Sequence, residues 1–210
     1  KYAQDIADTI YKYNYDGLDI DFEPNVDGVV GKLDENDTYV RWFLDILCKH
    51  LGPQSNSGKM LVIDGELWKV PVSAATYFDY FIGQAYSVSG GTPSPNAGQS
   101  ESNMDSRLTQ IINRFGGVMS EEEITKRFIV TENMESAIDA LNGGHFWTLR
   151  NGTRVDKAEC PSLLGMARWQ PVNGFRKGGF GGYRFSNEAV NKPSYKWMRT
   201  GIQAQNPAVN

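Results

Sequence analysis

Hydrophobic and polar residues along this chain recur with two different spacings, which alternate from segment to segment. Residues 2–13 place apolar side chains three or four positions apart, which predicts an amphipathic helix. Residues 17–23 alternate apolar and acidic side chains, with the period of two that is typical of a strand. Residues 35–51 return to helical spacing, and Gly52-Pro53 would end that helix.

The same alternation of strands and helices continues to the end of the chain. The predicted strands are 17–23, 59–64, 80–87, 127–132 and 179–186. Further helices are predicted over 71–79, 103–115, 161–169 and 193–203, with another acidic helix start at Ser120-Glu-Glu-Glu. Residues 88–102 are rich in Ser, Gly and Pro and predict a long loop, and residues 144–156 predict a hairpin that turns at Asn151-Gly152.

Strands that alternate with helices are typical of βαβ units, and therefore of an α/β fold with a parallel sheet. A (β/α)8 TIM barrel has eight such strands and usually about 250 residues. We interpret residues 1–210 as the C-terminal part of a single catalytic barrel domain, roughly its last five βα units. The first three strands would be absent from this chain, or a second chain or fragment would supply them and complete the barrel. A complete open α/β sheet is the alternative.

Composition narrows the classes of partner. The formal net charge is −4 and no basic patch stands out, which argues against a nucleic-acid partner. No run of 18 apolar residues exists, so we expect no membrane span. The two cysteines are too few for a disulfide framework, and Cys48 lies in an apolar helical run that predicts a buried free thiol. No His or Cys pair has the spacing of metal ligands, so we expect no metal or other cofactor.

Three carboxylates share one face of the predicted strand 17–23. Asp19, Asp21 and Glu23 are two positions apart, while the residues between them are apolar. Both faces of a parallel strand are normally covered, so we expect the acidic face to point into the barrel. Carboxylates aligned in a low-dielectric interior cannot all remain ionised, so at least one pKa should be raised. Glu23 is at the C-terminal end of the strand, where barrel enzymes carry their active sites. A surface strand with a solvated acidic face is the alternative.

The eight residues from Asp16 to Glu23 (Asp-Gly-Leu-Asp-Ile-Asp-Phe-Glu) resemble the active-site strand of glycoside hydrolase family 18. That family includes chitinases and endo-β-N-acetylglucosaminidases, and it works by a substrate-assisted mechanism. The resemblance implies that Glu23 protonates the leaving oxygen while the acetamido carbonyl of the substrate attacks the anomeric carbon. It implies that Asp21 orients the acetamido group and stabilises the developing positive charge. Asp19 would share a proton or a hydrogen bond with Asp21.

The predicted strand 80–87 bears on the substrate. Gln84 and Tyr86 share a face; the Tyr86 hydroxyl could bind the acetamido carbonyl, and Gln84 could bind a sugar or Asp21. Chitinases of the family usually have Met-x-Tyr-Asp here, whereas Gln84-Ala-Tyr86 resembles the endo-β-N-acetylglucosaminidase branch. That branch cleaves the β-1,4 bond between the two GlcNAc residues of the N-glycan core. A chitinase or chitooligosaccharide hydrolase, and a non-catalytic sugar-binding relative, are the alternatives; Tyr86 could also be a core aromatic.

Several other residues are candidates for binding an N-glycan or another GlcNAc-containing oligosaccharide. Glu132 and Asn133 end a predicted strand, where they could reach sugar hydroxyls or cap a helix. Asp64 and Glu66 follow another strand and have the same two interpretations. Trp147, in the predicted hairpin, could line the cleft. A secreted, periplasmic or cell-surface location follows only from this class of substrate.

Overall fold

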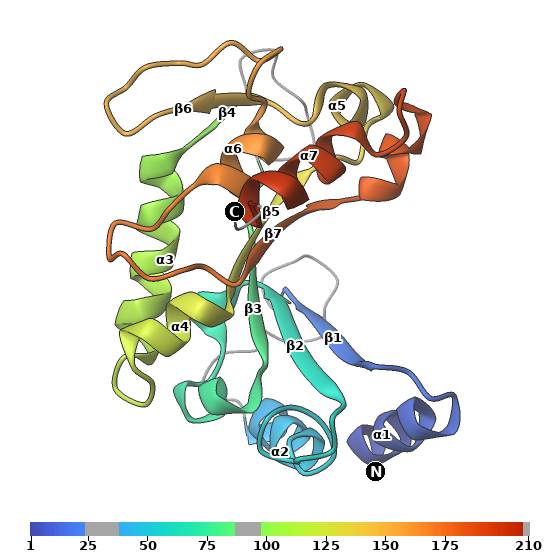
Figure 1. The fold of residues 1–210 in the computed structure, drawn as a ribbon. Coiled ribbons are helices and arrows are strands. Elements are labelled where there is room, and N and C mark those ends of the chain that lie inside the picture. Colours follow the sequence, from blue (N-terminus) through green and yellow to red (C-terminus); the bar gives the residue numbers. More distant parts are fainter. Residues whose placement is uncertain (24–37, 87–97, 208–210) are drawn as a thin grey trace. The chain divides into compact units, whose positions relative to one another are not determined.

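The computed structural model describes residues 1–23, 38–86 and 98–207 (Figure 1). The chain divides into two compact units, which are described separately. The first unit comprises Lys1–Gly83 and Gln110–Phe128, and the second comprises Gln84–Thr109 and Ile129–Asn210.

The first unit is built on three parallel strands. It contains α1 (Tyr2–Lys12), β1 (Gly17–Phe22), α2 (Thr38–Leu47), β2 (Met60–Gly65), the 3-10 helices η1 (Leu67–Lys69) and η2 (Val72–Tyr77), β3 (Tyr80–Gln84), the end of α3 (Glu101–Phe115) and α4 (Glu121–Arg127). Strand β2 pairs with β1 on one side and with β3 on the other, and both pairs are parallel. This part of the chain therefore has the predicted strand–helix alternation.

The core of the first unit lies on one face of these strands. Burial alternates along β2, where Leu61 and Ile63 are buried and the residues between them are only partly covered. The buried ring of Phe81 on β3 lies 5.2 Å from that of Phe115, measured between ring centroids. Burying such an aliphatic or aromatic side chain contributes about 1.5–3 kcal/mol. Strand alternation thus separates a covered face from a more open one.

The second unit contains two pairs of parallel strands. Its elements are β4 (Gly98–Ser100), the first part of α3, β5 (Phe128–Asn133), α5 (Ala137–Asn142), β6 (Phe146–Thr148), α6 (Ser162–Arg168), β7 (Gly179–Tyr183), the 3-10 helix η3 (Phe185–Val190) and α7 (Lys196–Gln205). Strand β5 pairs with β7, and β4 pairs with β6.

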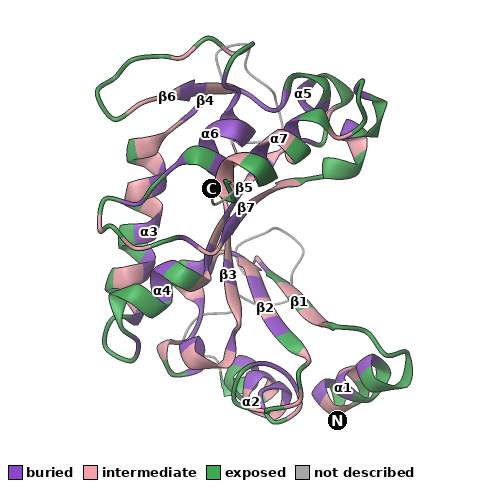
Figure 2. Cartoon of the chain, in the orientation of Figure 1, coloured by how far each residue is buried: buried purple, intermediate pink, exposed green. Residues whose placement is uncertain are grey.

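Helix α6 is the central element of the second unit. Its residues from Ser162 to Ala167 are all buried, which Figure 2 shows as a nearly continuous purple helix. A glycine is required in this helix because a Cβ at Gly165 would come within 2.1 Å of the indole of Trp147. A Cβ at Gly201 of α7 would come within 2.5 Å of the ring of Phe180 on β7. Small residues therefore allow helices and strands to pack closely here.

All five predicted strands are present, with shifts at their ends. The strand predicted over 80–87 ends at Gln84, so Tyr86 follows the strand instead of belonging to it. The strand predicted over 179–186 ends at Tyr183, and η3 begins at Phe185. A strand ends where its hydrogen bonds to the neighbouring strand end, and the side-chain pattern does not reveal this point.

Local predictions had mixed outcomes. The loop predicted over 88–102 is wrong at its end, because residues 98–100 form β4 and α3 begins at Glu101; α5 was not predicted. The predicted helix start at Ser120 is confirmed as a capping box with Glu123. The predicted hairpin is confirmed around Gly152, where Leu149 N–H donates to Thr153 O at 2.9 Å. Residues 88–97 of the predicted loop lie outside the described residues.

Cys48 is buried with a free thiol, as predicted, and so is Cys160. Burial is the main cause that raises the pKa of each thiol. Across residues 1–23, 38–86 and 98–207, no helix combines the length and the apolar character that crossing a bilayer requires.

Candidate functional site

The acidic residues of β1 lie on the more open face of the first unit. Asp19 is in register with Val62 of β2, and Asp21 with Asp64. Residues in register on parallel strands point to the same side, so Asp64 joins the acidic row. Tyr80 and Ile82 of β3, the partners of Val62 and Asp64, lie on the same face. Gln84 is the last residue of β3 and belongs to the second unit.

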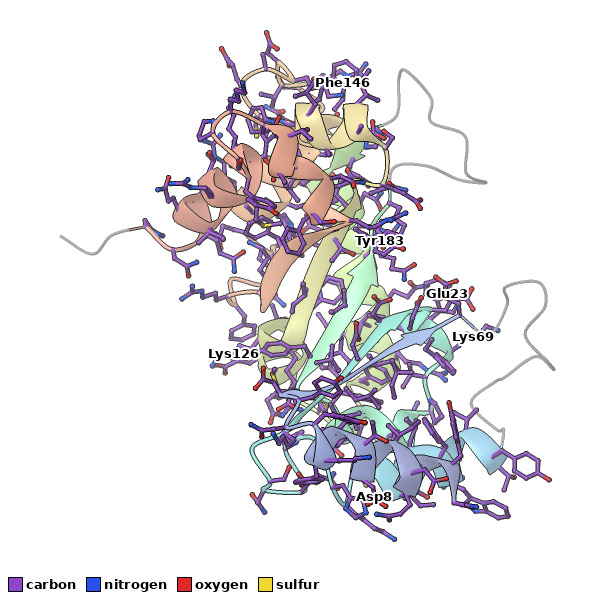
Figure 3. All side chains as sticks on the ribbon, turned by 90° about the vertical axis from the view of Figure 1, so that its right-hand side faces the viewer. Asp8, Glu23, Lys69, Lys126, Phe146 and Tyr183 are labelled. Carbon is purple, nitrogen blue, oxygen red and sulfur yellow. The ribbon has the colours of Figure 1, made fainter. Side chains whose placement is uncertain are left out.

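This face is more exposed than the sequence predicted. Asp19 and Asp21 are exposed and Glu23 is partly exposed, whereas the neighbouring Phe22 is buried. An enclosed interior was expected for these carboxylates. Strand β1 is at the edge of its sheet in the described part of the chain, so β2 alone borders it there. Figure 3 shows Glu23 directly after β1, at the carboxyl end of the strand.

One carboxyl group of the row has a raised pKa, as expected. Partial loss of water raises the pKa of Asp19, the negative charge of Asp21 raises it further, and a hydrogen bond from the backbone of Ile20 offsets part of the effect. Like charges on one strand face favour keeping one proton between them. Asp19 therefore takes up a proton more readily than an ordinary aspartate does.

A second group of candidate residues lies at the carboxyl ends of the strands in the second unit. The rings of Tyr86 and Tyr183 have centroids 6.4 Å apart and planes inclined by 30°. Tyr86 is half-buried and Tyr183 is 50% exposed. The backbone N–H of Ala85 donates to Thr131 O at 2.9 Å, which fixes the segment that leads to Tyr86. Tyr86 therefore has an accessible position at a strand end and is not a core aromatic.

Glu132 and Asn133 are neighbours at the end of β5, but they lie on opposite faces of the strand. Phe128, Val130 and Glu132 are buried, while the alternate residues Ile129, Thr131 and Asn133 are partly exposed. Asn133 is in register with Tyr183 and lies on that partly exposed face. Glu132 is 0% exposed on the opposite face and accepts hydrogen bonds from Ser162 Oγ and from the backbone N–H of Asn133. The prediction that Glu132 reaches sugar hydroxyls is corrected, since its carboxylate points into the protein.

Trp147 also belongs to the core. Its side chain is 2% exposed and packs over Gly165 of α6. The predicted cleft-lining role needs an exposed ring face, which this burial does not leave. Strand β6 pairs with β4, a strand that the sequence did not reveal, and this pairing places the indole inside.

The structure thus groups Asp19, Asp21 and Glu23 on or beside the open face of β1 in the first unit, whereas Gln84, Tyr86 and Asn133 belong to the second unit. Tyr183 was not among the predicted site residues. Its signal in the sequence was its place in a stretch of glycines and aromatics on the last predicted strand. Within the described ranges, no three His, Cys, Asp or Glu side chains form a group that could hold a metal ion.

Comparisons with known proteins identify the family of the chain. Residues 1–204 match the model of glycoside hydrolase family 18, BT1044-like. The chain is 25% identical over 211 residues to endo-β-N-acetylglucosaminidase F2 of Elizabethkingia meningoseptica. The alignment covers 93% of this chain and 52% of that protein. The chain therefore spans about half the length of this curated relative.

Solved structures show the same fold. A structure of BT1044 is 25% identical, with a TM-score of 0.73, and the match covers 98% of this chain and 58% of that chain. The apo endo-β-N-acetylglucosaminidase of Cordyceps militaris is 23% identical, with a TM-score of 0.61 and coverages of 98% and 61%. A chitinase of Chromobacterium violaceum is 14% identical, with a TM-score of 0.55 and coverages of 95% and 70%. The described α/β architecture is therefore part of a TIM barrel, as predicted.

Proposed function

Because the chain belongs to glycoside hydrolase family 18, we propose that it carries the catalytic strand of an endo-acting glycosidase for the N-glycan core. The bond cleaved is the β-1,4 bond between the two GlcNAc residues. The observation that carries this proposal is the row of Asp19, Asp21 and Glu23 on the open face of β1, which ends at the carboxyl end of the strand.

Glu23 serves as the acid and then as the base. Its proton goes to the glycosidic oxygen while the bond from that oxygen to the anomeric carbon breaks. The acetamido oxygen of the substrate forms the new bond to the anomeric carbon and gives an oxazolinium ion. Glu23 then removes a proton from water while the water oxygen attacks the anomeric carbon. The bond from this carbon to the acetamido oxygen breaks, which opens the oxazolinium ring. Two inversions retain the configuration at this carbon.

Asp21 and Asp19 act on the oxazolinium intermediate through hydrogen bonding and charge. Asp21 accepts a hydrogen bond from the acetamido N–H and balances the positive charge that develops on the oxazolinium ring. Asp19, whose pKa is raised by partial burial and by Asp21, supplies the shared proton that keeps the pair from carrying two full charges before substrate binds.

The proposed sugar-binding residues are Tyr86, Asn133 and Gln84, the last residue of β3. The Tyr86 hydroxyl contacts the acetamido carbonyl, and Gln84 and Asn133 bind sugar hydroxyls. Two relatives support the N-glycan core as substrate. One is named an endo-β-N-acetylglucosaminidase. The other, from Cordyceps militaris, is described in complex with fucosyl-N-acetylglucosamine-Asn, with 22% identity and a TM-score of 0.58. A secreted or cell-surface location is proposed from this substrate alone.

The decisive experiment offers the protein a high-mannose glycoprotein and, separately, chitooligosaccharides. Glycan release, measured by mass spectrometry, is expected from the glycoprotein and should be abolished by Glu23→Gln. Glu121→Gln is the matched control, because Glu121 is an exposed carboxylate in the first turn of α4. Cleavage of chitooligosaccharides alone would indicate a chitinase, and binding without cleavage of either substrate would indicate a sugar-binding relative.

A further inference from the structure

One buried side chain of the second unit hydrogen-bonds the peptide group that leads into Tyr86. Gln99 of β4 is 5% exposed, and its Nε2 donates to Ala85 O at 2.7 Å. Ala85 is itself 0% exposed, and a buried backbone carbonyl needs a donor. The Ala85 carbonyl and the backbone N–H of Tyr86 belong to one peptide group. Gln99 therefore acts on the peptide group to which Tyr86 is attached.

Two successive peptide groups before Tyr86 are held by different elements. The N–H of Ala85 donates to Thr131 O on β5 at 2.9 Å, just after β3 has ended at Gln84. This bond holds the peptide group between Gln84 and Ala85, and the bond from Gln99 holds the next one. Peptide groups are planar, so each residue has only two soft backbone dihedrals. Fixing both groups therefore limits the direction in which the chain enters Tyr86.

Asn103 of α3 sets the orientation of the Gln99 amide. Its Nδ2 donates to Gln99 Oε1 at 2.5 Å, so the acceptor end of that amide is occupied and its donor end faces Ala85. The backbone N–H of Asn103 donates to Ser100 Oγ at 3.1 Å, in the first turn of α3. A side-chain amide has one acceptor atom and one donor atom, which are not interchangeable. Gln99 therefore satisfies both partners in one orientation of its amide.

The backbone of Gln99 is fixed by the pairing of β4 with β6. Gln99 is in register with Trp147, whose side chain is 2% exposed and packs over Gly165 of α6. The support of Tyr86 is thus part of a packed core. A functional group keeps to one position when the residues that support it are themselves held by packing and hydrogen bonds.

We propose that Gln99 is a positioning residue, whose amide holds the peptide group before Tyr86 so that the Tyr86 hydroxyl reaches the acetamido group of the substrate. This inference rests on the function proposed above for Tyr86. Without the amide, Ala85 O loses a donor, and the chain at residues 85–86 moves to find another. A displacement of about 1 Å in a positioning group can lower a rate about 10²-fold.

The hold of Gln99 on Tyr86 can be measured by NMR, without reference to enzymatic activity. The chain has ten tyrosines, so a sample labelled with ¹⁵N-tyrosine gives up to ten backbone amide signals, and Tyr86→Phe identifies that of Tyr86. A hydrogen bond to a carbonyl oxygen changes the chemical shift of the amide nitrogen in the same peptide group. We expect Gln99→Met, which keeps the length of the side chain, to move the Tyr86 signal. An unmoved signal would overturn the proposal.

Asn191→Leu is the matched control. Asn191 is also 5% exposed and in the second unit, and its Nδ2 donates to Ala140 O and to Glu188 Oε1, both at 3.2 Å. Both substitutions replace a buried amide with an apolar side chain of similar size, so both should lower Tm. Only Gln99→Met should move the Tyr86 signal. Equal movement in both variants would mean that general loosening is the cause, and would reject a specific role for Gln99.

Asn103→Ala is the milder variant, which decides the question if Gln99→Met does not fold. Asn103 is partly exposed, so its loss leaves the core intact and only releases the Gln99 amide to turn. The Tyr86 signal should move in the same direction as in Gln99→Met, by a smaller amount. An unmoved signal in a folded Asn103→Ala sample counts against the proposal.

Kinetics test whether Gln99 acts through Tyr86. With a high-mannose glycoprotein as substrate, Gln99→Met should lower kcat by up to about 10²-fold, whereas Asn191→Leu should leave kcat nearly unchanged. When Tyr86→Phe has already removed the hydroxyl, adding Gln99→Met should lower kcat by no more than about twofold. Losses that multiply fully would overturn the proposal. If the unaltered protein releases no glycan, the proposed function fails, and the NMR signals still decide whether Gln99 holds Tyr86.

Discussion

Two strands of this chain, β1 and β5, end in carboxylates that meet opposite surroundings. Glu23 follows β1 on its open side, where Asp19 and Asp21 are exposed. Glu132, near the end of β5, is fully buried and receives hydrogen bonds from Ser162 and Asn133. Both carboxylates lie near the carboxyl end of a parallel strand, where barrel enzymes bind their substrates. The two carboxylates lie near the same end of a strand and differ in exposure, as the proposed catalytic role of Glu23 and a stabilising role of Glu132 would require.

The largest contrast is expected in activity. Glu23→Gln removes the proposed acid and should lower kcat about 10²–10⁴-fold, which is the usual contribution of a general acid. Tm should stay within about 2 °C of the unaltered protein, because Glu23 is partly exposed. Hydrolysis rates and thermal scans on the same sample check both parts. A large fall in Tm would mean that Glu23, too, is structural.

The reverse outcome is expected for Glu132→Gln. Removing one partner of a buried charge network costs about 3–5 kcal/mol, because the other charges are left uncompensated. The positive charge of Arg107 would lose the carboxylate that interacts with it. Circular dichroism should show a Tm lowered by about 10 °C. An unchanged Tm would contradict the assignment of Glu132 to the structural class.

Lys177 extends the comparison to a buried charge whose hydrogen bonds go to backbone carbonyls. It is 3% exposed, and its Nζ donates to Ala167 O and Trp169 O, both at 2.8 Å. Burial, and to a lesser degree the charge of Arg176, lowers its pKa from 10.5 to about 8. Between these two values the unfolded chain binds more protons than the folded one, so stability should rise with pH over this window. The lowered pKa corresponds to an increase of about 3 kcal/mol in the free energy of unfolding as pH rises through this window.

Urea unfolding of the unaltered protein and of Lys177→Met, from pH 7.5 to pH 10.5, measures this effect. The difference between the two curves isolates Lys177 from other groups that titrate in the same range. The free energy of unfolding should rise in the unaltered protein relative to the variant as pH increases. Parallel curves would mean that Lys177 is not desolvated in the folded state.

The sequence predicted the strands and the acidic row because both depend on local periodicity. Alternation in β1 identified the face of Asp19 and Asp21, and the order of strands and helices identified the fold class. The environments of Glu132 and Trp147 could not be predicted in the same way. Which face of β5 is buried depends on residues distant in sequence, such as Ser162, and Trp147 is buried because β6 pairs with the short strand β4. A three-residue strand has too few positions to show a period.

The smallest predicted effect tests the exposed row itself. The pKa of Asp19 is raised by partial burial and by Asp21, so its folded form retains a proton that the unfolded form has lost. This contribution to stability is present at low pH and disappears as pH rises through the folded pKa. Asp19→Asn removes the repulsion with Asp21, so it should raise Tm by about 1 °C at pH 7 and leave it unchanged at pH 3. Thermal scans at the two pH values measure this difference.

Activity should nevertheless fall, because Asn cannot share a proton with Asp21 as the acid does. This would place Asp19 with Glu23, as a residue kept for chemistry at a small cost in stability. A lower Tm at pH 7 would instead place it with Glu132, among the carboxylates that stabilise the fold.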